Sequence, residues 1–238
     1  MRKIPAFFLL FFIITACSDD NEEAITKADY ISEDPVNAAE NAKDMDALEY
    51  IEFQHNEEQI IVDISKIPIL HEFLRMHQHP QQAIRKMKLE KLELSLQDIY
   101  TLSFSCRNES CSYILLHQNQ NKQASLVADM ARFVSSYSSP DESKVALHFI
   151  RHGAETIPLS SLVVFDIVEW KPLSITKGET APNILNYSWP FLSVEWLDEK
   201  NIAIAIPDLI EPNKESYDEW TMTEGNSVNT IVFQIETE

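Results

Sequence analysis

Three groups of side chains are of types that could do chemistry. They are the triplet Arg151-His152-Gly153, the histidines His71, His77 and His79, and the cysteines Cys106 and Cys111. A histidine beside an arginine suits phosphoryl transfer, several imidazoles together suit zinc, and paired cysteines suit a disulfide, a redox pair or a metal site. Each chemistry depends on partners that the rest of the chain must supply.

The triplet at 151–153 resembles the phosphohistidine motif of the histidine phosphatases. The resemblance implies that His152 would accept the phosphoryl group and that Arg151 would help to hold the phosphate. That family needs a second histidine and a second arginine, and a helix soon after the motif. No histidine or arginine follows the triplet, and the next run, 158–170, is strand-like. We therefore reject the phosphatase reading and interpret the triplet as the end of a strand, with Gly153 starting a turn.

The three histidines are poorly spaced for a shared ligand on a helix. His71 and His77 are six residues apart and point to different faces, and His77 and His79 are two apart. We predict no metal site and interpret these histidines, the only candidates, as polar residues near a helix end. The glycines Gly153, Gly178 and Gly225 are widely separated, which excludes a phosphate-binding Walker loop or dinucleotide fingerprint. No cofactor is predicted.

The beginning of the sequence is typical of an export signal. Arg2 and Lys3 precede an almost entirely apolar run at 4–15, too short for a membrane-spanning helix, which needs about 20 residues. The letters ITAC, ending at Cys17, resemble the lipobox of bacterial lipoproteins. The resemblance implies a signal peptide at 1–16, lipidation of Cys17, and a position on the extracytoplasmic side of the cell membrane, or of the outer membrane in a two-membrane host. The alternative is an ordinary secretory signal or uncleaved anchor with a chance cysteine.

Export would place the other two cysteines in an oxidising environment. Cys106 and Cys111 are separated by four residues between two strand-like runs, so outside the cytoplasm we expect a disulfide near a hairpin turn. A metal or redox pair would need further cysteines or the Cys-x-x-Cys spacing.

The net charge of the chain excludes some classes of binding partner. The net charge of −19 excludes a nucleic-acid-binding surface, and lipid rather than charge must hold the protein at a membrane. Residues 17–46 are acidic without a sustained apolar period, and they predict a disordered tether before one globular domain at 47–238. Five basic residues lie close together in this acidic sequence. We interpret them as a solvated helix face, and the alternative is that they contact anionic lipid or an acidic partner. These residues are Arg75, Arg85, Lys86, Lys88 and Lys91.

The predicted fold is α+β and mostly antiparallel β, with a helical piece at about 67–91. The patterns indicate two strands around a turn at 55–58, a short strand at 123–133, a buried strand at 162–168, a hairpin at 191–207 and a last strand at 230–236, with an acidic loop at 211–220. No repeat strong enough for a propeller or solenoid is visible.

One turn adds a second resemblance. Ser139-Pro140-Asp141, before the strand-like run 144–149, resembles the Ser-Pro-Asp hairpin of periplasmic β-propeller proteins and of small membrane-tethered lipoproteins of Gram-positive bacilli. Proteins of the second kind are largely of unknown function, so the likeness implies a location and a β-rich architecture. We therefore expect a non-enzymatic binding or accessory module of the cell envelope, with a possible envelope protein partner. The alternative is an extracytoplasmic hydrolase with an unrecognised site.

Overall fold

The computed structural model describes residues 49–55, 58–95, 97–118, 124–152, 157–179 and 181–236. The chain divides into two units, Met1–Ile31 and Ser32–Glu238, and every described residue belongs to the second. The signal peptide, Cys17 and the tether, predicted within 1–46, therefore lie outside the described residues. In the described part of the chain, no helix has the length and apolar character needed to cross a membrane.

The domain begins with a hairpin and two short helices. Strands β1 (Tyr50–His55) and β2 (Glu58–Asp63) pair in antiparallel register, as the sequence predicts. A 3-10 turn, η2 (Ile64–Lys66), leads into α1 (Pro68–Arg75) and then α2 (Pro80–Ile84), each opened by a proline in its first turn. Leu70 and Leu74, one turn apart on α1, are fully buried.

The helical piece predicted at 67–91 is too long. Residues 88–91 form a strand, β3 (Lys88–Lys91), which pairs with β4 (Ile99–Arg107). Leu89 lies buried between two outward-facing residues, a period-two pattern, and the pairing covers what would otherwise be an open edge of β4.

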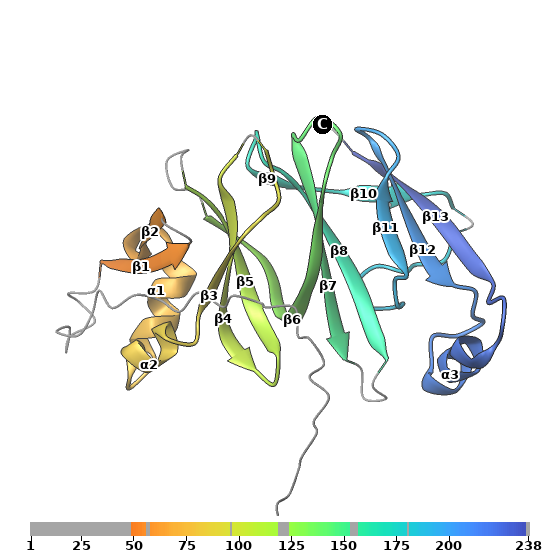
Figure 1. Ribbon diagram of the computed structural model, residues 1–238, viewed down its shortest axis with the longest axis horizontal. Coiled ribbons are helices and arrows are strands. Elements are labelled where there is room, and N and C mark those ends of the chain that lie inside the picture. Colours follow the sequence, from red (N-terminus) through yellow and green to blue (C-terminus); the bar gives the residue numbers. More distant parts are fainter. Residues whose placement is uncertain are drawn as a thin grey trace, which may run out of the picture. The chain divides into compact units, whose positions relative to one another are not determined.

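A seven-stranded antiparallel sheet follows in chain order from β3 to β9 (Figure 1). Its remaining strands are β5 (Ser110–His117), β6 (Ala124–Ser138), β7 (Lys144–His152), β8 (Pro158–Asp166) and β9 (Lys171–Leu173). β6 is longer than the predicted strand at 123–133 because it serves two neighbours. Its first half pairs with β5 and its second half with β7.

A four-stranded antiparallel sheet has the order β10-β13-β12-β11. These strands are β10 (Ile175–Lys177), β11 (Ser193–Trp196), β12 (Asn201–Pro207) and β13 (Val228–Ile235). The predicted hairpin and last strand are confirmed, so the fold class is α+β and mostly antiparallel β.

Two expected segments differ from the structure. The acidic loop predicted at 211–220 contains helix α3 (Lys214–Met222), which Asn213 caps by accepting a hydrogen bond from the Ser216 N–H at 2.9 Å. The buried strand predicted at 162–168 ends at Asp166, whose carboxylate accepts hydrogen bonds from the next two free N–H groups and turns the chain. Val168 is consequently 56% exposed.

Three hydrophobic cores lie on successive sheet faces. The first joins β1, β2, α1 and α2 to one face of β4 and β5, and the second joins the other face of those strands to β7 and β8. The third joins the remaining face of β7 and β8 to the four-stranded sheet. Both faces of the long sheet are thus covered, which is why β4, β5 and β7 are buried along most of their length.

Candidate functional site

Arg151 and His152 lie exposed at the end of β7, and Gly153 lies outside the described residues. The Arg151 guanidinium donates to the backbone carbonyls of Asp129 and Met130, at 2.5 and 3.1 Å, and lies 3.9 Å from the Tyr187 ring centroid. These contacts hold the bend of β6, where Met130 has a φ of 49°. Arg151 is therefore engaged in structural contacts.

A buried histidine and serine form a pair that the sequence did not reveal. The Ser160 hydroxyl oxygen lies 3.0 Å from His148 Nε2 and accepts a hydrogen bond from the Phe191 N–H at 3.1 Å. The Ser160 hydroxyl can also donate its proton to Nε2 when the ring carries its hydrogen on Nδ1. Burial lowers the pKa of His148 to about 4, and the ring stacks on Phe191. Both side chains are buried, so the pair fastens the segment near Phe191 to the sheet.

The structure brings only two of the three candidate histidines together. His77 and His79 line a pocket between α1, α2 and the end of β4, whereas His71 is not among its described lining residues and has a nitrogen 3.9 Å from Glu72. Nδ1 of His77 lies 2.7 Å from the Phe73 carbonyl oxygen, which can only accept, so Nδ1 carries the hydrogen. Among the described residues no group of three His, Cys, Asp or Glu side chains could hold a metal ion.

We call this recess the helix–disulfide pocket. Its volume is about 410 Å³. The side chains that distinguish it are Phe73, His77, His79, Lys86, Cys106 and Arg107. None of the described residues that line it is acidic, although the chain carries a net charge of −19.

A distortion of β4 forms one wall of this pocket. The register with β5 shifts between Phe104 and Arg107, and Ser105 has a φ of 54°, in the left-handed region that costs a non-glycine residue energy. Cys106 and Cys111 lie at disulfide distance, with their Cα atoms 4.0 Å apart, as the sequence predicted. The cross-link joins the bulged strand to β5, and Arg107, the residue after Cys106, lines the pocket.

A second recess, which we call the turn groove, lies beside the Ser-Pro-Asp turn. Its volume is about 510 Å³, and its lining includes Glu93, Tyr137, Ser139, Glu142, Glu195 and Trp196. No described lining residue is a lysine, arginine or histidine. The Glu142 carboxylate accepts a hydrogen bond from the Ser95 N–H at 3.0 Å. Glu142 has a φ of 52°, in the left-handed region that favours glycine.

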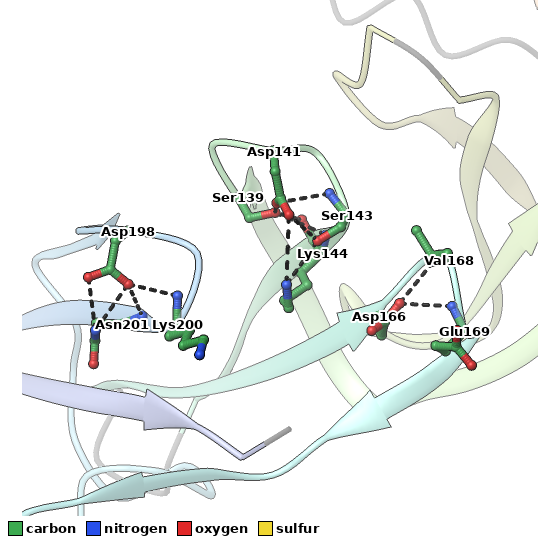
Figure 2. A network of polar contacts seen from close by, with 10 residues as sticks. All are labelled: Ser139, Asp141, Ser143, Lys144, Asp166, Val168, Glu169, Asp198, Lys200 and Asn201. Carbon is green, nitrogen blue, oxygen red and sulfur yellow. Dashed lines mark hydrogen bonds and ion pairs between the residues drawn. The ribbon is translucent and has the colours of Figure 1, made fainter. Parts of the chain in front are cut away.

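Aspartates close the neighbouring turns (Figure 2). Asp141 accepts from the Ser139 and Ser143 hydroxyls, at 2.6 and 2.7 Å, and from the Ser143 N–H at 3.1 Å. Burial alone would raise the pKa of Asp141, but these hydrogen bonds outweigh it and lower the pKa to about 2. Asp166 and Asp198 accept backbone N–H groups of their own turns in the same way. The carboxylates here complete backbone turns.

Of the five basic residues noted in the sequence, two are paired with acids, one lines the pocket, and Arg85 and Lys88 are exposed. Arg75 pairs with Glu72 at 2.8 Å and Lys91 with Asp98 at 2.6 Å, whereas Lys86 lines the helix–disulfide pocket. Sequence reasoning missed Arg107 as the second cation of this pocket, because only the pairing of β4 and β5 brings it there. No family model matches the chain, and searches of curated proteins and solved structures found no match.

Proposed function

We propose that the protein is a membrane-anchored extracytoplasmic lipoprotein, lipidated at Cys17, that serves as a non-enzymatic binding module of the cell envelope. The signal-like N-terminus and the lipobox resemblance support the location. The helix–disulfide pocket supports the binding role. It is a recess about 410 Å³ in volume, in the range of small-ligand sites, and its walls are a helix pair and a cross-linked strand.

The polar groups of this pocket suit binding better than catalysis. Ser105 is its only described hydroxyl-bearing residue, and among the described residues no hydrogen bond joins Ser105 to His77 or His79. A serine nucleophile needs a base within hydrogen-bond reach, and a general acid or a metal would add a carboxylate or a ligand cluster. The lining instead offers cations, neutral amides and apolar surface, which hold a ligand in place.

Lipidation and location are tested together. Replacing Cys17 with serine should abolish incorporation of radiolabelled palmitate and release the protein from the membrane fraction. The double variant Cys106→Ser/Cys111→Ser is the matched control, because it removes two cysteines while leaving the proposed lipid attachment, and it should remain labelled and membrane-bound. Unchanged membrane retention of the Cys17→Ser protein would contradict the anchor.

Binding at the pocket is tested by site-specific photo-cross-linking in intact envelopes. A photoreactive residue at Gln82, in the pocket lining, should give an adduct that is absent when the same residue replaces Lys200, an exposed position in the β11–β12 turn. Identical adducts at both positions, or hydrolysis of ester and phosphoester substrates that is lost with Ser105→Ala, would refute a non-enzymatic binding site here.

A further inference from the structure

We propose that the helix–disulfide pocket binds a small organic anion, in which one oxyanion group, phosphate or carboxylate, is joined to a compact apolar body. The inference deepens the proposed binding role by naming the chemical class of ligand, and it concerns the same pocket. Lys86 and Arg107 contact the oxyanion, and the apolar lining receives the rest of the ligand.

The charge of the pocket is opposite to that of the protein. The chain has 38 acidic residues and 19 lysines and arginines, yet the described lining holds Lys86 and Arg107 and no carboxylate. A local reversal of charge in a recess raises the local concentration of anions there.

The two cations have no competing partner within the described part of the chain. Some other basic side chains are engaged, among them Arg75 with Glu72, Lys91 with Asp98, and Lys214 with Asp218. No hydrogen bond or ion pair of the Lys86 or Arg107 side chain is found among the described residues. Their donors are therefore available to a ligand, and the ligand would not have to displace an internal carboxylate.

The cations come from two different elements. Lys86 follows α2, and Arg107 ends the bulged part of β4 beside the disulfide. A planar guanidinium binds phosphate or carboxylate in a bidentate manner, while an ammonium contributes a point charge from another direction. Such a pair suits one oxyanion held between α2 and β4.

The remaining lining suits an apolar body with polar edges. Phe73, Met76 and Ala83 supply apolar surface, and Gln78 and Gln82 supply neutral hydrogen-bonding groups. The Phe73 ring is held by an edge-on contact with Phe104, at 5.2 Å between centroids, and by the His77 ring at 4.3 Å. The aromatic wall is thus fixed before a ligand arrives, which lowers the entropic cost of binding.

The direct test is calorimetric titration of the detergent-solubilised full chain with phenyl phosphate, which has both parts of the proposed ligand. We expect saturable binding that is tighter than the binding of inorganic phosphate or of phenol. Lys86→Gln and Arg107→Gln should each weaken binding by about fivefold to tenfold, and the double variant should weaken it further. Lys88→Gln is the matched control, because Lys88 is an exposed lysine two residues away that does not line the pocket, and its affinity should be unchanged.

The source of the oxyanion is distinguished by competition. If dioleoyl phosphatidic acid in the same detergent displaces phenyl phosphate more strongly than inorganic phosphate does, the oxyanion belongs to a lipid head group; if it does not, the ligand is a soluble organic anion. Either result supports the pocket chemistry. Absence of phenyl phosphate binding, or equal affinity in the Lys86→Gln, Arg107→Gln and Lys88→Gln proteins, would overturn it. Retention of the Gln82 cross-link in that case would leave the broader binding role standing.

Discussion

The helix–disulfide pocket and the turn groove are recesses of similar size with opposite charge. The first has two cations and no described carboxylate, and the second has three glutamates and no described cation. They also differ in what their charged groups do. Glu142 in the groove is bonded to the backbone of Ser95, and the nearby Asp141 closes a turn, whereas Lys86 and Arg107 have no partner in the described part of the chain.

The difference shows which charges are informative in an acidic protein. Where carboxylates are abundant, they serve as acceptors for backbone N–H groups and as a source of solubility. Cations are scarce in this protein. Two cations that line one recess and have no internal partner are therefore a stronger sign of a ligand than a group of carboxylates would be. This comparison predicts that damage near the groove changes stability alone, while damage to the pocket changes binding as well.

The largest expected effect is that of acid on the free energy of unfolding, through the buried His148, which lines neither recess. Burial lowers the pKa of His148 to about 4, so between pH 6.5 and pH 4 the unfolded chain binds more protons than the folded one. The contribution of neutral His148 is complete above pH 6.5 and is lost as the pH falls towards 4, about 3 kcal/mol in all. Denaturant unfolding at several pH values should show this slope.

The control is His148→Gln, whose amide oxygen can still accept from the Ser160 hydroxyl but does not titrate. Its free energy of unfolding should fall less steeply over the same pH range. Parallel pH profiles for the two proteins would show that His148 is not the group responsible.

Removing the disulfide should affect the helix–disulfide pocket and leave the turn groove unchanged. The double variant Cys106→Ser/Cys111→Ser opens a short loop, which costs about 2 kcal/mol of unfolding free energy by the chain-entropy estimate. Because Cys106 and Arg107 line the pocket, phenyl phosphate should also bind more weakly. The tryptophan fluorescence of the protein, to which Trp196 in the groove contributes, should keep its spectrum. Loss of stability with unchanged affinity would show that the cross-link does not position Arg107.

The complementary experiment changes the Ser-Pro-Asp turn beside the turn groove and leaves the helix–disulfide pocket intact. Asp141→Ala removes an acceptor of three hydrogen bonds from a partly exposed site and should lower the free energy of unfolding by about 1.5 kcal/mol, without altering phenyl phosphate affinity. Since the pKa is depressed to about 2, this contribution is present above pH 4 and is lost as the pH falls towards 2. Asp208→Ala, an exposed aspartate, is the control and should have little effect.

The smallest expected effect is that of salt on the affinity for phenyl phosphate. Raising sodium chloride from roughly 50 to roughly 500 mM shortens the screening length and should weaken phenyl phosphate binding by about threefold, because Lys86 and Arg107 are exposed at the pocket. The affinity of Lys86→Gln/Arg107→Gln, where measurable, should respond less. An affinity that rises with salt would indicate apolar binding only.

Local patterns predicted much of the fold. The hairpins at β1–β2, β11–β12 and the cysteine pair follow from alternating apolar residues around polar turns. Helix α3 was missed because it buries no residue, so it has no apolar period, and its signs are the cap Asn213 and the Lys214–Asp218 pair. β3 was missed because four residues after a helix are too few to show a change of period.

The candidate site was harder to foresee. His77, His79 and Lys86 are close in sequence, but the histidines were noted as candidate metal ligands and Lys86 as part of a basic group. Arg107 is far along the chain, and its position depends on a β-bulge, a cross-link and the packing of Phe73 on Phe104. Sequence spacing carries no information about such a contact, since it is made only when the first core assembles.

The shared strand β6 has a mechanical consequence for how the domain opens. Its first half is hydrogen-bonded to β5 and its second half to β7, so separation of the strands on one side removes the support of those on the other. Strands β4 to β8 should therefore gain or lose amide protection against hydrogen exchange as one cooperative unit. The β1–β2 hairpin pairs with no other described strand, so it can open at a lower free-energy cost than the cooperative unit. Since the wall that carries Arg107 belongs to the cooperative unit, brief openings of the hairpin would leave it intact.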